Sequence, residues 1–393
     1  MGMKLNTTAI ALVLLLASAA EVSEGASIDV TKHGAKADGS DISQALLAAW
    51  KEACASPTPS SVLVPAGTYG LGQISFEGPC KAPINLIVEG TLKAPVDTRN
   101  FKADAGWVSF QNIDHFTLSG KGVFDGQGPA VWGKKCARSS YCGALPINLR
   151  FNFLTNSMVR DVTTKDSKQF HVNVLGCKNL SFYHFTVSAP EESLNTDGIH
   201  IGRSSGINIT NTNIKTGDDC ISIGDGSQQI TIDQVTCGPG HGISVGSLGK
   251  YANEAPVVGI KVTGSTLTNT QNGIRVKTWP ASPAGIASNM HFEDIIMNNV
   301  GNPILIDQEY CPYNQCQQQM PSRVKISDVA FKNIRGTSST ELAVKLVCSS
   351  GVPCQNVQLT DINLKFNGGA PTSICKNVKP VLGGVQQPRS CSA

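Results

Sequence analysis

Four polar clusters between residues 195 and 277 contain the side chains best suited to chemistry. Together they supply acidic groups, an imidazole and two cations. A short β-branched run follows or surrounds each cluster, so we expect these groups at the edges of strands. Such a set is typical of a hydrolase that uses carboxylates on an anionic substrate. The clusters are Asn195-Thr196-Asp197, Gly217-Asp218-Asp219, Gly240-His241-Gly242 and Arg275-Val276-Lys277.

The spacing of these clusters indicates a repeat. The pattern [D/H]-[G/C]-I-x-[I/V] begins at Asp197, Asp219 and His241, at intervals of 22 residues. Looser copies begin at Asn272 and Asn302, at intervals of 31 and 30 residues. Repeats of this length built from short strands predict a parallel β-solenoid.

A solenoid brings equivalent residues of successive repeats together. Neighbouring coils lie about 4.8 Å apart, so Asp197, Asp219 and His241 are expected to line one groove. Side chains alternate along a strand. If the isoleucine and valine beside them point inward, Arg275 and Lys277 point outward together and face the same surface.

Composition favours one all-β domain. Charged residues make up 16% of the chain, against roughly 25% in average domains. Polar turn residues separate strand-like runs throughout, and no composition break divides residues 27–393, so a single domain is expected there. The runs are Ile84 to Val88, Phe116 to Leu118, His171 to Leu175, Leu180 to Val187, Ile207 to Ile214, Ile230 to Val235, Val257 to Leu267, Val324 to Phe331 and Val357 to Leu364.

One helix is predicted from Asp41 to about Ala55. Asp41 is its expected N-cap, and an apolar stripe of Ile42, Ala45, Leu46, Ala49 and Ala53 follows at helical spacing. An open solenoid exposes unpaired strand edges, so this helix is expected to cover the first coil.

The first 26 residues resemble a secretory signal peptide. Lys4 supplies a basic start, Ala9 to Ala17 a short apolar core, and Ala17-Ser18-Ala19 a small-residue cleavage signal, with the cut expected between about 19 and 26. No later segment has the 18 to 20 apolar residues that a membrane span requires. A soluble, secreted protein is therefore expected, and Asn179 and Asn208 lie in sequons for N-linked glycans.

The 13 cysteines fit an oxidising compartment. Spacing suggests six disulfides and leaves Cys177 as a buried thiol, although spacing alone does not establish connectivity. The suggested pairs are Cys54 with Cys80, Cys136 with Cys142, Cys220 with Cys237, Cys311 with Cys316, Cys348 with Cys354 and Cys375 with Cys391. Histidine ligands are missing beside the closely spaced cysteines, so no zinc or other metal site and no cofactor are expected.

The four clusters, in this order, resemble the signature of polygalacturonases, family 28 of the glycoside hydrolases. The resemblance extends over essentially the whole mature chain, from residues 29–35, similar to the family's N-terminal strand, to the cysteine-rich tail. Plant pollen-type exopolygalacturonases are the most similar subgroup. The resemblance implies a right-handed parallel β-helix with an open cleft. It also implies inverting hydrolysis of α-1,4-galacturonosyl bonds in polygalacturonate, outside the cell and in the plant wall.

The resemblance also implies catalytic roles. Asp218 would be the general acid, Asp197 and Asp219 would hold the nucleophilic water, and His241 would maintain the protonation and geometry of the acid. Three neighbouring aspartates cannot all ionise at low cost, so one of them can stay protonated. Without the resemblance, each aspartate taken singly is as well explained by turn formation, and His241 by a structural hydrogen bond.

Substrate-binding roles are implied for Asn195, Arg275, Lys277 and Tyr310. Arginine offers a planar fork to a carboxylate and lysine a mobile point charge, which suits a polymer with one carboxylate per sugar. Two cations on a strand are otherwise more often a solvated face. Trp279 is a weaker candidate for stacking on a sugar ring.

Other functions remain open at this stage. The same residues could serve an endo-acting polygalacturonase, because exo or endo action depends on loop conformations. A calcium-dependent pectate lyase, distinguishable by chelation and unsaturated products, and a non-catalytic wall-binding β-helix are alternatives from other classes. A formal charge of +3 and the lack of a basic tract argue against nucleic-acid binding, and a monomer is expected.

Overall fold

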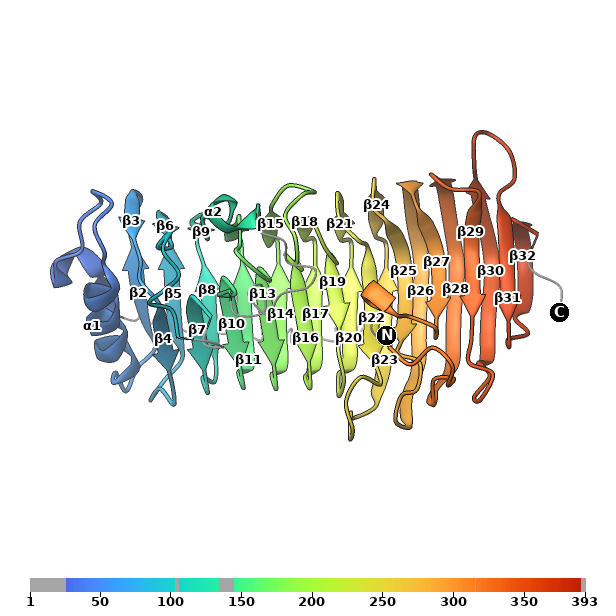
Figure 1. Ribbon diagram of the computed structural model, residues 1–393. Coiled ribbons are helices and arrows are strands. Elements are labelled where there is room, and N and C mark those ends of the chain that lie inside the picture. The colour runs from blue at the N-terminus through green and yellow to red at the C-terminus, as the bar shows by residue number, and fades with distance from the viewer. Residues whose placement is uncertain (1–25, 103–105, 134–144, 315, 390–393) are drawn as a thin grey trace, which may run out of the picture.

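The computed structural model describes residues 26–102, 106–133, 145–314 and 316–389. The chain winds through successive coils into one elongated parallel β-helix (Figure 1). Two hydrogen-bonded sheets of 21 and 11 strands run along it. The predicted signal peptide lies outside the described residues except for Ala26, where the first strand begins.

The 11-stranded sheet contributes one strand per coil; three of the four clusters lie in turns that enter its strands, and the fourth lies on β25. Its strands are β4 (Ile74–Glu77), β7 (Val108–Gln111), β10 (Leu149–Asn152), β13 (Val172–Leu175), β16 (Ile199–Gly202), β19 (Ile221–Ile223), β22 (Ile243–Leu248), β25 (Asn272–Thr278), β27 (Asn302–Asp307), β29 (Leu342–Val347) and β31 (Thr372–Lys376).

The 21-stranded sheet starts as two rows and ends as one. The first row is β1 (Ala26–Asp29), β2 (Ser60–Val64), β5 (Ile84–Val88), β8 (Phe116–Ser119), β11 (Thr155–Arg160), β14 (Lys178–Tyr183), β17 (Ser205–Thr210), β20 (Gln228–Asp233) and β23 (Val257–Thr263). The second row is β3 (Thr68–Gly70), β6 (Thr91–Lys93), β9 (Val123–Asp125), β12 (Thr163–Lys165), β15 (Thr186–Ser188), β18 (Asn213–Lys215), β21 (Thr236–Cys237) and β24 (Thr266–Thr268). Both rows join at β26 (Gly285–Val300), and the single row continues as β28 (Val324–Ser338), β30 (Gln355–Lys365) and β32 (Val381–Gln387).

The repeat predicted from the sequence is confirmed as the register of the 11-stranded sheet. Ile199, Ile221, Ile243, Ile274 and Ile304 are paired in turn from β16 to β27. All five side chains lie in the core. The same interior holds a stack of aromatic rings, with Phe110 parallel to Phe76 and Phe151 at 5.2 Å between ring centroids.

Several predicted strands are divided in the structure. The run Leu180 to Val187 falls into β14 and β15, and the run Ile207 to Ile214 into β17 and β18. His184 and Asn211, at the breaks, have φ angles of 50° and 53°. Each therefore bends the chain at a corner of the coil, which hydrophobic pattern alone does not indicate.

The predicted N-terminal helix is present as α1 (Ser43–Cys54), at one end of the solenoid (Figure 1). Its apolar face packs into the core and covers the first coils, as expected. The predicted N-cap is wrong by one residue, because Ile42 occupies that position. The Asp41 carboxylate still accepts a hydrogen bond from the Ser43 backbone N–H at 2.8 Å.

Shorter helices complete the fold. Residues 29–35 were expected to form a strand, but only Asp29 belongs to β1, and Val30–His33 form the 3₁₀ helix η1. In the part of the chain that the structure describes, the other helices are α2 (Pro129–Trp132) and η3 (Pro312–Asn314). Among the described residues, no helix combines the length and the apolar character needed to cross a bilayer.

Four predicted disulfides are confirmed: Cys54–Cys80, Cys220–Cys237, Cys311–Cys316 and Cys348–Cys354. Cys375 is also disulfide-bonded. The predicted pair Cys136–Cys142 and the expected partner Cys391 fall outside the described residues. Cys177 is a free, fully buried thiol, as predicted, and burial raises its pKa to about 11. Of the two glycosylation sequons, Asn179 is exposed and Asn208 is partly buried.

Candidate active site

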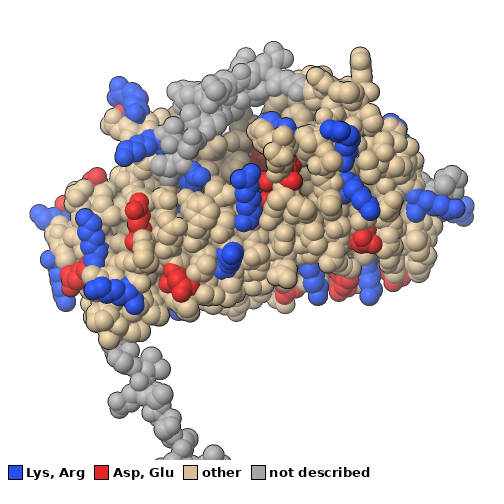
Figure 2. All heavy atoms as spheres, turned by 90° about the horizontal axis from the view of Figure 1, so that it is seen from below, with Lys and Arg blue, Asp and Glu red and all other residues tan. Residues whose placement is uncertain are grey.

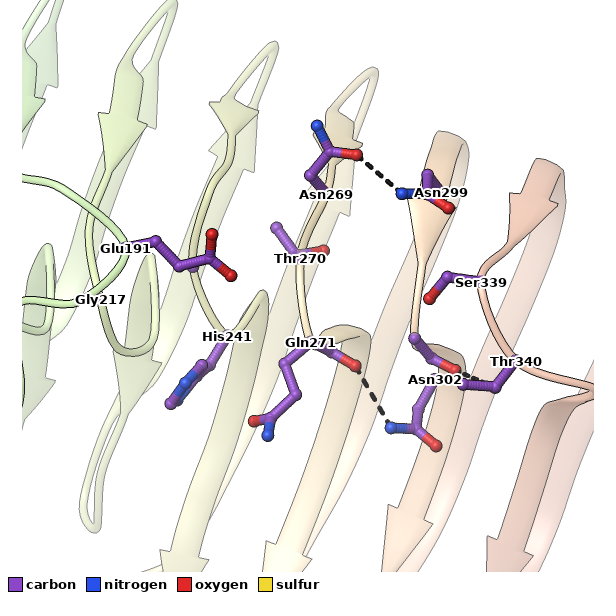
Figure 3. Close-up of a pocket in the computed structure, with 12 residues that line it drawn as sticks. Glu191, Gly217, His241, Asn269, Thr270, Gln271, Asn299, Asn302, Ser339 and Thr340 are labelled. Carbon is purple, nitrogen blue, oxygen red and sulfur yellow. Dashed lines mark hydrogen bonds between the residues drawn. The ribbon is translucent and has the colours of Figure 1, made fainter.

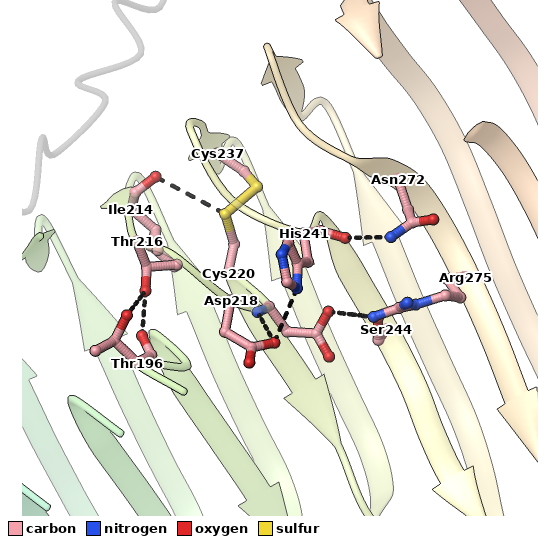
Figure 4. The surroundings of a disulfide bond; sticks show 11 residues. Thr196, Ile214, Thr216, Asp218, Cys220, Cys237, His241, Ser244, Asn272 and Arg275 are labelled. Carbon is pink, nitrogen blue, oxygen red and sulfur yellow. Dashed lines mark hydrogen bonds and ion pairs between the residues drawn. A yellow bond between two sulfur atoms is a disulfide. The ribbon is translucent and has the colours of Figure 1, made fainter. Parts of the chain in front are cut away.

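Three turns, each entering a strand of the 11-stranded sheet, carry the acids and the imidazole. Asp197, Asp219 and His241 each lie two residues before β16, β19 and β22, and Asp218 lies in the same turn as Asp219. Buried hydroxyls hold two of these turns together (Figure 4). Thr196 and Thr216 are 2.8 Å apart at their Oγ1 atoms, and Thr196 Oγ1 also accepts from the Gly217 N–H.

Asp218 and His241 form the most accessible pair of the site. Asp218 Oδ1 lies 3.1 Å from His241 Nδ1, and the two side chains are 27% and 35% exposed. The His241 backbone N–H donates to the Asp218 carbonyl at 2.6 Å. Gly240 and Gly242 have φ angles of 154° and 88°, which a side chain would disfavour. The flanking glycines therefore permit the turn that places the imidazole on this carboxylate.

Asp219 is buried and neutralised by two cations. Its carboxylate oxygens lie 2.6 Å from an Arg275 guanidinium nitrogen and 2.8 Å from Lys277 Nζ. Ser244 donates a third hydrogen bond at 2.9 Å. Burial alone would raise the pKa of Asp219, but the two cations lower it to about 2. This residue is an ionised carboxylate throughout the ordinary pH range.

The two cations do face the same surface, as predicted, but they are not open to solvent. Arg275 is 8% exposed and Lys277 is 6% exposed. Alternation along β25 places both on the outer face of the strand, where they reach past β22 to the buried carboxylate of Asp219, which lies two coils away. The sequence predicts that both side chains point outward, but it does not predict their ion pair with Asp219.

Asp197 has different partners. Ser222 donates to Asp197 Oδ2 at 2.8 Å, and His200 Nδ1 lies 2.7 Å from the same hydroxyl. Because Ser222 has one proton and gives it to Asp197, it accepts from a Nδ1–H of His200. Burial raises the pKa of Asp197 well above its ordinary value, and Asp218 and Asp219 raise it further. Burial also lowers the pKa of His200 to about 4, so its ring is neutral.

Sequence reasoning missed His200, Ser222 and Ser244. All three occupy the variable position of the repeat, and their strands pair them in one row that continues to Arg275. The alternation that predicts an outward Arg275 applies equally to them. That signal was present in the sequence and would have placed two hydroxyls and an imidazole beside the acids.

The Cys220–Cys237 disulfide reinforces the acidic turn (Figure 4). Cys220 directly follows Asp219, and Cys237 ends β21, four residues before His241. Asn272 Nδ2 holds the other side of the turn through the His241 carbonyl at 3.2 Å. Covalent and hydrogen-bonded connections thus fix the carboxylates relative to the imidazole.

Tyr310 lies beside the cations. Its ring centroid is 5.2 Å from Lys277 Nζ and 6.0 Å from the Arg275 guanidinium carbon. The Trp279 ring meets it edge to face at 5.8 Å. Asn195 lies two residues before Asp197 with a φ angle of 59° and is partly exposed. The binding roles of these residues stay predictions.

Asp218, Asp219 and His241 offer ligand atoms that all lie within 4.8 Å of one another. This geometry would be suitable for a metal ion. However, Asp219 already has two cationic partners at hydrogen-bonding distance. Two positive charges beside the same carboxylate oppose the binding of a third, so these residues are poorly suited to hold a metal.

The long β-helix carries carboxylates of opposed pKa shift beside an imidazole and two nearly buried cations, a combination that suits a glycoside hydrolase. Its outer surface mixes acidic and basic side chains among neutral ones, as Figure 2 shows for one face. Residues 54–391 match glycosyl hydrolases family 28, and the chain belongs to this family. The predicted right-handed parallel β-helix is confirmed with it.

Known proteins are similar along nearly the whole chain. An exopolygalacturonase of Oenothera organensis is 59% identical over 356 residues, which cover 90% of this chain and 98% of the relative. A polygalacturonase of Gossypium hirsutum is 54% identical over 384 residues, covering 97% and 94%. Among solved structures, an endo-xylogalacturonan hydrolase of Aspergillus tubingensis superimposes with a TM-score of 0.78 at 25% identity, covering 92% of this chain and all of that one.

Proposed function

We propose that this chain hydrolyses α-1,4-galacturonosyl bonds of polygalacturonate with inversion, releasing units from the chain end. The observation that carries the proposal is the arrangement of three acids. Asp218 is accessible beside His241, while Asp197 and Asp219 are buried behind it with pKa values shifted in opposite directions. Inverting glycosidases need such a division between a proton donor and groups that activate water.

The roles follow from accessibility and charge. Asp218 donates a proton to the glycosidic oxygen as the bond from C1 to that oxygen breaks. Asp219, always ionised, holds the attacking water by hydrogen bonding. Asp197, whose raised pKa makes it the stronger proton acceptor, removes the water proton as the new bond to C1 forms. In the proposed reacting state Asp218 carries the proton that it donates, and Asp197 is ionised.

Binding is proposed for Asn195, Arg275, Lys277 and Tyr310. The cations keep a positive field at the outer surface of β25, and the Tyr310 ring lies beside both. A free galacturonate carboxylate is attracted to this field, and a methyl ester is not. Methyl-esterified pectin should therefore be cleaved much more slowly than polygalacturonate, and equal rates would refute this binding role.

The proposals of exo action and of a location outside the cell are each supported by other observations. Two plant relatives at 59% and 55% identity are named exopolygalacturonase. The signal-like first 26 residues and the disulfides suit a secreted protein that acts, as a monomer, in the cell wall. The lyase and the non-catalytic alternatives have no such support, because the chain belongs to a hydrolase family and keeps every motif residue.

Product sizing at early times tests the proposal. Purified enzyme and polygalacturonate are sampled at a few per cent conversion and separated by anion-exchange chromatography. Galacturonate monomer alone supports exo action. A ladder of saturated oligomers would show an endo-acting hydrolase, and unsaturated oligomers would show a lyase.

A further inference from the structure

The two cations assigned to substrate binding share their charge with a buried acid. Arg275 and Lys277 are 8% and 6% exposed, and both contact the ionised carboxylate of Asp219. That carboxylate partly offsets their attraction for a galacturonate unit. Recognition of a polymer with one carboxylate per sugar would gain from a further cation that is exposed and has no acidic partner.

The cavity beside His241 does not supply such a cation (Figure 3). It has a volume of about 630 Å³ and is lined mainly by turns that precede β22, β25, β27 and β29, with Glu191 at one side. None of the described residues that line it is lysine or arginine. A further substrate carboxylate placed there would meet the Glu191 carboxylate without a compensating lysine or arginine.

Lys250 lies at the opposite edge of the 11-stranded sheet. The strands are parallel, so the segments that follow β22, β25 and β27 share one edge, and they carry Lys250, Trp279 and Tyr310. Lys250 is exposed. No carboxylate of the described residues lies within ion-pair distance of its ammonium group, which instead lies 5.3 and 5.4 Å from the ring centroids of Tyr251 and Trp279. Its charge is therefore available to an anionic ligand.

Two aromatic rings connect the buried cations to Lys250. The Tyr310 ring centroid is 5.2 Å from Lys277 Nζ, and the Trp279 ring meets Tyr310 edge to face at 5.8 Å. Lys250 Nζ then lies on the Trp279 ring. Rings of this kind offer an apolar surface to the C–H face of a sugar. Cations thus lie at both ends of a continuous aromatic surface formed by Tyr310 and Trp279.

The loop that carries Lys250 is held in place by Glu254. One carboxylate oxygen of Glu254 accepts the backbone N–H of Gly249 at 2.6 Å, and the other accepts the backbone N–H of Tyr251 at 2.9 Å. These two donors flank Lys250 in the sequence, so the backbone on both sides of it is fixed. The position of Lys250 beside Trp279 is therefore built into the loop.

We propose that Lys250 is a specificity-determining residue that binds the carboxylate of a second galacturonate unit, next to the unit held at Tyr310. The first carboxylate lies at Arg275 and Lys277, the chain crosses the Trp279 ring, and the second carboxylate pairs with Lys250 at the exposed edge of the site. This inference rests on the proposed function. It adds a preference for two consecutive unesterified units over one.

The test compares steady-state constants on digalacturonate and trigalacturonate, because only the longer oligomer has a unit that reaches Lys250. Lys250→Met should raise the KM for trigalacturonate about tenfold with kcat within about twofold, the sign of a lost binding contact. Lys250→Arg should keep most of the affinity. Because the contact is exposed, the effect of Lys250→Met should shrink as salt is raised. Lys261→Met, at an exposed lysine on β23 of the other sheet, is the matched control and should keep the wild-type constants.

Three outcomes would overturn the inference. The first is an unchanged KM for trigalacturonate in Lys250→Met. The second is an equal rise in Lys261→Met, which would mean that any surface lysine contributes through the overall charge. The third is a fall in kcat at constant KM, which would remove Lys250 from a binding role. Failure of the wild-type enzyme to release galacturonate from either oligomer would instead reject the proposed function, so the two claims fail separately.

Discussion

Lys277 Nζ lies 2.8 Å from Asp219 Oδ2, with both side chains nearly excluded from solvent. The two residues are 58 positions apart in the sequence and are brought together by the coils. A buried carboxylate would ordinarily resist ionisation. This lysine, together with Arg275, keeps Asp219 charged inside the β-helix.

Lys277→Met should destabilise the protein and raise the pKa of Asp219. Removing one partner leaves an incompletely compensated buried charge, which costs about 3 to 5 kcal/mol. Lys277 also lowers the pKa of Asp197, the proposed base, and activity is lost as pH falls through the pKa of either acid, so the acid limb of the pH–rate profile should move to higher pH. Urea unfolding and the pH dependence of kcat/KM measure both effects. Lys345→Met, on the same sheet at β29, should change neither, and an unmoved acid limb in Lys277→Met would contradict the role of the pair.

Asp197→Asn should be nearly inactive yet more stable than the wild type at neutral pH. A folded-state pKa raised above the unfolded value of about 3.8 contributes stability at lower pH that is lost as pH rises toward the folded pKa. Asparagine does not titrate. The difference in Tm between variant and wild type should therefore grow from about pH 4 upward. Thermal unfolding from pH 3 to 8 measures this difference. A difference in Tm that does not change with pH would show that folding does not raise the pKa of Asp197.

Ser222→Ala and Ser244→Ala form a matched pair on adjacent coils. Ser222 donates to Asp197, and Ser244 donates to Asp219, which keeps two cationic partners. Loss of a hydrogen bond to a buried acid costs roughly 1 to 3 kcal/mol. We expect a fall in kcat of about 10- to 100-fold for Ser222→Ala and a smaller fall for Ser244→Ala. The reverse order would mean that the link from His200 through Ser222 does not position Asp197.

Chelation should leave the activity unchanged. The cluster of Asp218, Asp219 and His241 could hold a metal by geometry, but Arg275 and Lys277 already balance the charge of Asp219. Rates on polygalacturonate before and after dialysis against EDTA provide the measurement. Loss of activity that Ca²⁺ restores would contradict this electrostatic account.

The sequence predicts the pairing of strands between successive coils well, because a period of 22 residues with isoleucine at one position is compatible with only one register. Ile199, Ile221 and Ile243 pair as that period requires. Corners are harder to predict. The break at Asn211 depends on a positive φ angle, which asparagine tolerates without requiring it.

The sequence predicted that Asp197, Asp219 and His241 lie close together, but it did not predict the contacts that these side chains make. Alternation places Arg275 and Lys277 on the outer face, but their burial depends on how far the Asp219 side chain extends from another coil. Burial raises the pKa of Asp197, whereas the contacts with Lys277 and Arg275 lower the pKa of Asp219. Strand spacing alone does not specify them.

The anomeric form of the first product tests the central claim most directly. Proton NMR of fresh digests of an α-1,4-linked galacturonate oligomer should show the β-anomer of the released sugar before mutarotation. Asp218→Asn should lower the rate about 10²- to 10⁴-fold with the fold retained, while Asp328→Asn, on β28 of the other sheet, should not. Initial appearance of the α-anomer, or near-wild-type activity in Asp218→Asn, would contradict an inverting hydrolase with Asp218 as its acid.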